Sequence, residues 1–201
     1  MQFPPFDAEI NELIREHRDY TRLAMFATAL HRLRQESIDG SLAEVGVFRG
    51  DTSVLLNRLA PDRTLHLFDT FNGFPSEDLI GASAEDAERF SDTSSESVRE
   101  RLPADARVRL HPGRVPATLS AVSDEKFAFV LIDLDLHAPT IGALNFFYPR
   151  LVSGAFLFLH DYNSPESAWA CMRAMDGFIS DKPEQLTDVC DRFGSVVFRK
   201  Q

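Results

Sequence analysis

The chain has 201 residues, of which 44% are hydrophobic and 26% charged, as in an ordinary globular domain. Its 21 Lys and Arg against 31 Asp and Glu give a formal net charge of -10, which argues against nucleic-acid or anionic-membrane partners. No stretch approaches the ~20 apolar residues of a membrane helix, and the N-terminus lacks the features of a signal peptide. We expect a cytoplasmic protein that acts on small molecules, with Cys171 and Cys190 as buried thiols rather than a disulfide.

The first 40 residues read as helical. Apolar side chains have helical spacing from Asp7 to about Glu36, and a break at residues 18–21 divides this stretch into two helices. Thr21 is a candidate N-cap for the second helix. We expect residues 1–40 to form a helical segment that covers the site or contacts a second copy in a homodimer, and residues 41–201 to form the main domain.

Strands and helices alternate from residue 41 onward. Five strands are predicted, over Leu42–Val47, Thr64–Asp69, Arg107–His111, Phe127–Asp133 and Ala155–Leu159. Helices are expected from a cap at Asp51 or Thr52, from a capping box at Thr93–Glu96, at Pro139, and from Ser164-Pro165 to about Ile179. The segment Thr70–Ser91 reads as a loop, with a short helix near Ala84–Phe90.

The strand pattern favours one fold. The run Phe127–Asp133 is nearly all apolar, as expected of a central parallel strand that is buried on both faces. Two short strands near Gln185–Cys190 and Ser195–Arg199 predict a closing antiparallel hairpin. The sequence therefore predicts an α/β, doubly wound, Rossmann-like sheet of the class I methyltransferase type, mostly parallel with an antiparallel hairpin at its C-terminal end.

A glycine loop follows the first strand, with the spacing Glu44-x-Gly46-x-x-x-Gly50. Glycines let the backbone approach a ligand, and the free N–H groups of the next helix attract negative charge. The spacing differs from the G-x-G-x-x-G of dinucleotide sites. An acidic residue before a looser turn suits a cofactor with a cationic amino-acid end, such as S-adenosylmethionine. A structural turn in an unrelated α/β protein is the alternative.

Asp69 ends the second strand, 19 positions after Gly50. A carboxylate at this place commonly accepts the ribose hydroxyls of a nucleoside cofactor. The alternative is a carboxylate that caps a turn. Loop and carboxylate together favour a nucleoside cofactor.

Acidic residues gather at the ends of the fourth and fifth strands: Asp133, Asp135, His160 and Asp161. These strand ends meet at one edge of a parallel sheet. Because clustered carboxylates repel one another, a bound cation is the simplest explanation. Oxygen ligands favour Mg²⁺, and the histidine leaves Mn²⁺ or another transition ion open. The alternative is that Asp161 caps a loop while His160 makes a hydrogen bond in the core.

Other residues near the expected cleft are weaker candidates. His137 follows Asp135 closely and could act as a general base near pH 7, and His111 is a second histidine of this kind. A lone histidine is more often a surface or structural residue. An adenine or substrate pocket could be lined by the aromatic residues Phe71, Phe74, Phe90 and Tyr162.

Several runs of the chain resemble one family, the macrocin O-methyltransferases. The runs are Glu44-Val-Gly-Val-Phe-Arg-Gly50, Phe68-Asp-Thr-Phe-Asn-Gly-Phe-Pro75, Phe90-Ser-Asp-Thr-Ser94, His111-Pro-Gly-Arg-Val115, Ile132-Asp-Leu-Asp-Leu-His137 and Leu159-His-Asp-Tyr162. The resemblance covers about Tyr20 to Asp176. It implies S-adenosylmethionine- and Mg²⁺-dependent methylation of sugar hydroxyls in macrolides and related natural products.

The resemblance also implies roles for single residues. Gly46 and Gly50 would form the methionine-side loop, with Thr52 and Ser53 near the methionine carboxylate. Asp69 would hold the ribose, and Phe71 with Arg114 would border the adenine. The metal positions match Asp133, His160 and Asp161, and Tyr20-Thr21 matches a segment that covers the site.

The chain departs from the family pattern at four positions near the acceptor. His160 stands where the family usually has Asp, and Leu134 where it has Gly. His137 replaces a common Tyr, and Ala138 a frequent Glu. We expect Asp133, Asp135 and His137 to be the catalytic set, with Asp135 or His137 taking the proton of the acceptor hydroxyl. The alternatives are a non-catalytic S-adenosylmethionine-binding domain and, against the glycine spacing, an NAD-linked reductase.

Overall fold

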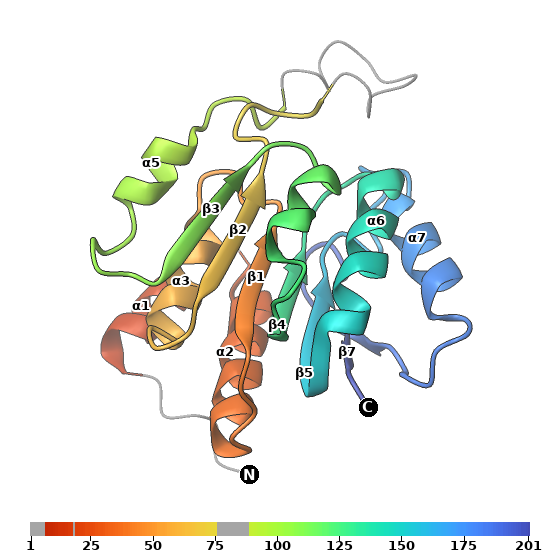
Figure 1. The fold of residues 1–201 in the computed structure, drawn as a ribbon, viewed down its shortest axis with the longest axis horizontal. Coiled ribbons are helices and arrows are strands. Elements are labelled where there is room, and N and C mark those ends of the chain that lie inside the picture. The colour runs from red at the N-terminus through yellow and green to blue at the C-terminus, as the bar shows by residue number, and fades with distance from the viewer. Residues whose placement is uncertain (1–6, 18, 76–88) are drawn as a thin grey trace.

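The computed structural model describes residues 7–17, 19–75 and 89–201, which form a seven-stranded sheet with helices on both faces (Figure 1). The strand order is β3-β2-β1-β4-β5-β7-β6. The parallel strands are β1 (Ser41–Val45), β2 (Leu65–Asp69), β3 (Val108–Pro112), β4 (Phe127–Ile132) and β5 (Leu151–Leu159). An antiparallel edge is added by β7 (Val196–Arg199) and β6 (Thr187–Asp188). The predicted α/β sheet with its closing hairpin is confirmed.

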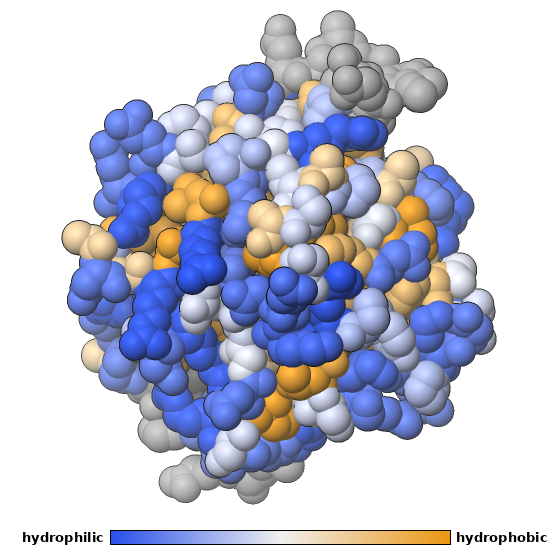
Figure 2. Space-filling view, viewed as in Figure 1, coloured by the Kyte–Doolittle hydropathy of each residue, from blue (hydrophilic) through white to orange (hydrophobic). Residues whose placement is uncertain are grey.

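Helices cover the two faces of this sheet separately (Figure 1). On one face lie α1 (Ala8–Glu16), α2 (Tyr20–Gln35) and α3 (Asp51–Leu59), and on the other α6 (His137–Phe147) and α7 (Ala170–Ile179). The remaining described helices are α5 (Ser95–Glu100) and the 3-10 turns η2 (Ala117–Val122) and η3 (Tyr148–Arg150). None of the helices that the structure describes is long and apolar enough to cross a membrane. Hydrophilic side chains dominate the face shown in Figure 2.

Strand β4 lies between two apolar layers, and all its residues are buried. On the α2 side, Phe26 packs edge-on against Phe129 and Phe158, with ring centroids 5.6 and 4.9 Å apart. Burial of a phenylalanine of this kind stabilises the fold by roughly 2–3 kcal/mol. Since α2 contributes to this core, it helps to hold the sheet, while the expected division of the chain at residue 40 stays a prediction. The core fixes the carboxyl ends of β1, β2, β4 and β5 at one edge.

Several helix starts differ from the prediction. Asp19, not Thr21, accepts from the first turn of α2. Gly50 precedes α3 with φ 78° and no side-chain cap, in place of Asp51 or Thr52. The capping box of α5 is shifted by one residue, to Ser94 and Ser97.

The largest difference is at α7, which begins at Ala170 rather than at Ser164-Pro165. Ala168 and Trp169 have φ values of 49° and 55°, and this left-handed backbone interrupts the expected helix. Both cysteines are free, as expected, but Cys190 is exposed where a buried thiol was predicted. The helix expected near Ala84–Phe90 lies mostly outside the described residues.

Candidate active site

A cavity of about 450 Å³ opens at the carboxyl ends of the parallel strands. Most of the predicted site residues line it: Glu44, Gly46, Thr52, Asp69, Arg114, Asp133, Asp135, His160 and Asp161. Gly50, Ser53, Phe71 and His137 are not among its lining residues. The structure therefore brings the predicted cofactor loop and the acidic cluster to one cavity, and places four predicted residues outside it.

Gly46 joins the two parts of the cavity. Its φ is 93°, and a Cβ built there would lie 1.8 Å from the backbone oxygen of Asp133. The close approach follows from the pairing of β1 with β4, whose ends carry these two residues. Only glycine fits between the strand ends, so the loop's first glycine is explained by packing as well as by ligand approach.

Glu44 is buried beneath the loop, with 2% of its surface exposed. The Ser53 hydroxyl donates to Glu44 Oε2 at 2.5 Å. Burial raises the pKa of the Glu44 carboxyl to about 8, and the nearby Asp133 charge adds to this, while the Ser53 hydrogen bond opposes it. Ser53 thus reaches the cavity only through Glu44.

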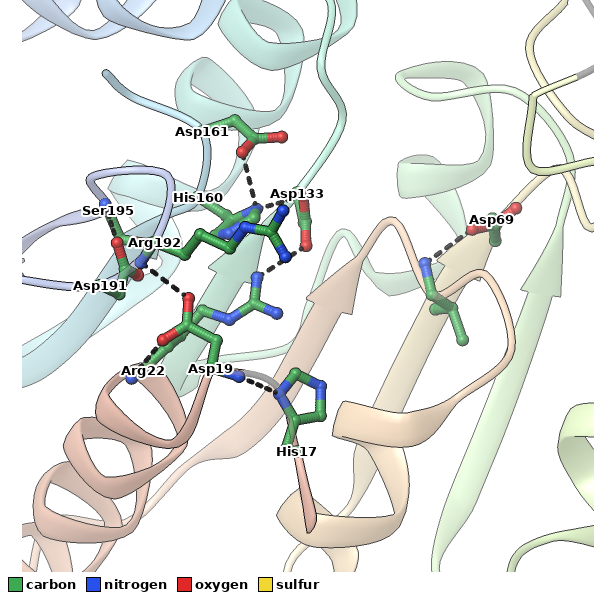
Figure 3. A network of polar contacts seen from close by, with 11 residues as sticks. His17, Asp19, Arg22, Asp69, Asp133, His160, Asp161, Asp191, Arg192 and Ser195 are labelled. Atoms are coloured by element: carbon green, nitrogen blue, oxygen red, sulfur yellow. Dashed lines mark hydrogen bonds and ion pairs between the residues drawn. The ribbon is translucent and has the colours of Figure 1, made fainter. Parts of the chain in front are cut away.

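Asp69 fastens two loops together. Its Oδ2 accepts the N–H groups of Val47 and Phe48 at 2.6 and 2.9 Å, and its Oδ1 accepts the N–H of Phe71 at 2.7 Å. Figure 3 shows this carboxylate at the end of its strand, apart from the acidic cluster. The residue predicted to hold ribose hydroxyls therefore also fixes the shape of the glycine loop.

Aromatic rings form one wall of the cavity. Phe90 packs edge-on against Phe48 and Phe74, with centroids 5.1 and 5.4 Å apart. Phe74 and Phe90 were expected here, and Phe48 was not. Phe71, although expected at the adenine, is buried in the core, and the Tyr162 hydroxyl donates to Asp176 Oδ1 at 2.7 Å.

The two candidate histidines lie away from the cavity lining. His137 is exposed at the first position of α6. His111 contacts the His66 ring, with His66 Nδ1 and His111 Nε2 3.0 Å apart, and stacks on Phe68. Burial lowers the pKa of both His66 and His111. Of the two predicted bases, Asp135 alone lines the cavity.

The acidic cluster is built from the residues directly after β4 and β5 (Figure 3). His160 Nδ1 lies 2.9 Å from Asp133 Oδ1 and 3.3 Å from Asp161 Oδ1. Burial lowers the pKa of His160, but the adjacent Asp133 and Asp161 outweigh it and raise the value to about 10. Burial, together with the hydrogen bond that protonated Asp135 donates to Asp161, holds the pKa of Asp135 well above its usual range.

This donor set suits a divalent cation. The ligand atoms of Asp133, His160 and Asp161 all lie within 4.8 Å of one another. Ligands bonded to one ion at ~2.0–2.2 Å are separated by about 3 Å when they are neighbours, close to the two distances found here. One nitrogen and two carboxylates therefore fit Mg²⁺, and fit Mn²⁺ or another transition ion better.

Arg22 is a site residue that the sequence analysis missed. Its side chain is 10% exposed, and its Nη1 lies 3.4 Å from Asp133 Oδ2. The signal was an arginine on the apolar stripe of α2, one turn before Phe26. Tyr20, from the Tyr20-Thr21 segment expected to cover the site, is 64% exposed. The neighbouring residues His17 and Arg22 line the cavity instead.

Comparison with known proteins identifies the family of the chain. A model of the macrocin O-methyltransferase (TylF) family matches residues 18–200. Mycinamicin III 3''-O-methyltransferase of Micromonospora griseorubida is 26% identical over 195 residues, which cover 84% of this chain and 75% of that enzyme.

Two further proteins are similar. 8-demethyl-8-(2,3-dimethoxy-alpha-L-rhamnosyl)-tetracenomycin-C 4'-O-methyltransferase of Streptomyces olivaceus is 27% identical over 142 residues, which span 63% of this chain and about half, 54%, of that enzyme. The structure of the O-methyltransferase NovP aligns with a TM-score of 0.78 at 24% identity, over 90% of this chain and 80% of NovP. The chain belongs to the macrocin O-methyltransferase family, whose members are enzymes that transfer methyl groups.

Proposed function

We propose that this chain is an S-adenosylmethionine- and divalent-cation-dependent O-methyltransferase acting on a hydroxyl of a sugar or similar small natural product. One observation supports it above the others: the glycine loop and the Asp133–His160–Asp161 cluster line one cavity and touch at Gly46. The rhamnosyl group in the name of one relative favours a sugar hydroxyl. A cytoplasmic location and a homodimer remain proposals from the sequence.

In the cofactor half, the chain supplies a preformed loop. Gly46 and Thr52 present the loop and the start of α3 to the methionine end, and Glu44 beneath them offers a carboxyl for its ammonium group. Gly50 and Ser53 act indirectly, through the turn and through Glu44. Asp69 and Arg114 line the nucleoside side.

In the acceptor half, Asp133, His160 and Asp161 would hold the cation. When bound, S-adenosylmethionine supplies an electrophilic methyl group, and a divalent cation supplies positive charge that lowers the pKa of an acceptor hydroxyl. Asp135 lines the cavity beside this cluster, and the positive charge of a bound cation would lower its raised pKa, so we assign the Asp135 carboxylate the acceptance of the hydroxyl proton. Arg22 offsets part of the charge of Asp133. Alignment of the two reactants is the chain's main further contribution.

The test is release of S-adenosylhomocysteine with a panel of rhamnosides and other glycosides. We expect EDTA to abolish methyl transfer, added Mg²⁺ or Mn²⁺ to restore it, and Asp161→Ala to reproduce the loss. Asp62→Asn, which alters an exposed ion pair with Arg34, serves as the control and should keep full activity. Full activity in metal-free buffer would contradict the cation role. Cofactor binding without transfer to any acceptor would favour a non-catalytic domain.

A further inference from the structure

His160 is flanked by a second pair of carboxylates, besides Asp133 and Asp161 (Figure 3). Carboxylate oxygens of Asp19 and Asp191 and a ring nitrogen of His160 all lie within 4.8 Å of one another. His160 is 6% exposed, and its buried Nε2 has no hydrogen-bond partner among the described residues. Because Asp133 and Asp161 engage Nδ1, the nitrogen left for Asp19 and Asp191 is Nε2.

One imidazole cannot serve both pairs as a metal ligand. A neutral ring carries one lone pair and one N–H. If Nδ1 binds a cation together with Asp133 and Asp161, then Nε2 must carry the proton and needs an acceptor. A buried N–H without an acceptor destabilises the protein, because the hydrogen bonds to water that it loses are not replaced.

Asp19 and Asp191 are held in place by the main chain. Asp19 accepts the N–H of Arg22 at 3.4 Å and that of Arg192 at 3.0 Å. Asp191 accepts the N–H of Ser195 at 2.7 Å and also its hydroxyl. These bonds immobilise both carboxylates beside His160, yet leave lone pairs free. They also connect the start of α2 with the turn before β7, at opposite ends of the sequence.

We propose that Asp19 and Asp191 are positioning residues for His160. They accept its Nε2 proton, directly or through one water, and so direct the Nδ1 lone pair toward Asp133 and Asp161. The inference rests on the proposed cation site. Carboxylates that orient a metal-binding histidine in this way typically change metal affinity by 10–100-fold.

The experiment is a double-mutant cycle on Mn²⁺ affinity, measured from the EPR signal of free Mn²⁺. Asp19→Asn and Asp191→Asn are made in the wild type and in His160→Asp, which has no imidazole N–H to satisfy. Asparagine caps a helix as well as aspartate does, so Asp19→Asn preserves the start of α2. We expect each variant to weaken Mn²⁺ binding about 10-fold or more in the wild type, and by less than about threefold in His160→Asp.

Two controls separate positioning from folding. Ser195→Ala removes a hydroxyl that holds Asp191 but no group facing His160, so it should change Mn²⁺ affinity far less than Asp191→Asn. Long-range ¹H–¹⁵N spectra of the Zn²⁺-loaded wild type should show the His160 proton on Nε2.

Three outcomes would overturn the inference. Equal losses in both backgrounds mean that Asp19 and Asp191 act on folding alone, and a proton on Nδ1 reverses the assigned tautomer. Both leave methyl transfer as the proposed function, although a proton on Nδ1 would remove His160 from the ligands of the cation. A wild type that binds no Mn²⁺ removes the cation role from the proposed function as well, while S-adenosylmethionine binding, measured separately, reports on the cofactor half.

Discussion

The two halves of the cavity satisfy their polar groups in different ways. In the cofactor half, Asp69 accepts three backbone N–H groups, and Glu44 accepts the Ser53 hydroxyl. In the acidic half, Asp133, Asp135 and Asp161 crowd around His160. Among the buried side-chain atoms that the structure describes, Arg22 Nε and His160 Nε2 in this half lack partners.

The two halves therefore differ in how far their geometry depends on a bound ligand. The cofactor loop is shaped by its own hydrogen bonds, so a cofactor would meet a preorganised surface. In the acidic half, like-charged carboxyl groups lie close together, and their ion-pair partners are the side chains of Arg22 and His160. The geometry of the acidic half should therefore depend on what binds there. The geometry of the cofactor half should not. Three substitutions test this contrast.

Gly46→Ala should disrupt both halves of the cavity together, and we expect it to have the largest effect of the three substitutions. The new Cβ would lie 1.8 Å from the Asp133 oxygen and 2.7 Å from its carbonyl carbon, at a φ of 93°. Backbone atoms cannot move aside cheaply, so we expect a loss of more than about 3 kcal/mol in the free energy of unfolding. Urea unfolding and binding of both S-adenosylmethionine and Mn²⁺ would measure it.

Gly177→Ala is the matched control for this change. Gly177 lies within α7, and a Cβ there would have no atom within 4 Å. We expect stability to be unchanged or to rise by about 0.5–1 kcal/mol. If Gly46→Ala were as harmless as Gly177→Ala, the two halves would not be coupled through the strand ends.

Asp135→Asn should affect the acidic half alone. If Asp135 accepts the hydroxyl proton, kcat should fall about 100-fold or more, while S-adenosylmethionine affinity stays within about threefold. His137→Gln is the comparison, because His137 was the other predicted base and lies exposed at the start of α6. The measurement is steady-state methyl transfer. A large loss in His137→Gln with little in Asp135→Asn would reverse the assignment.

The sequence predicted the sheet and the edge at which the site lies, because hydrophobic periodicity and the ends of strands can be read from the local pattern of residues. The run Phe127–Asp133 identified the central strand, and carboxylates after two strands identified the cluster. Helix starts were less predictable. The left-handed turn at Ala168-Trp169, which delays α7, has no glycine to signal it.

The directions of the side chains could not be predicted from the sequence. Phe71 follows Asp69 closely, yet enters the core, because Asp69 binds its N–H and turns the chain. Arg22, Asp19 and Asp191 reach the cluster from distant segments, and only tertiary packing brings them together. Local patterns therefore located the ligating residues but not the residues that support them.

Glu44→Gln should affect the cofactor half alone, with the smallest effect of the three. Because burial raises the pKa of Glu44 to about 8, the free protein holds it mostly protonated at pH 7. Binding a cationic ammonium group should ionise it, so S-adenosylmethionine binding should release up to one proton. Calorimetry in buffers of different ionisation enthalpy measures that proton.

In Glu44→Gln, proton release should vanish and affinity for S-adenosylmethionine should fall about 10-fold, or ~1.4 kcal/mol, with Mn²⁺ affinity unchanged. The raised pKa also fixes the sign of a stability effect. Protonated Glu44 contributes stability fully below pH ~4.5, and that contribution is lost as pH rises toward 8, by up to ~1 kcal/mol per unit. Glu44→Gln should therefore gain on the wild type in urea unfolding between pH 5 and 8, whereas Glu125→Gln, at the opposite end of the sheet, should not. Proton release that persists in Glu44→Gln would mean that a group other than Glu44 loses the proton. The cofactor half, like the acidic half, would then contain charge that its own hydrogen bonds do not stabilise.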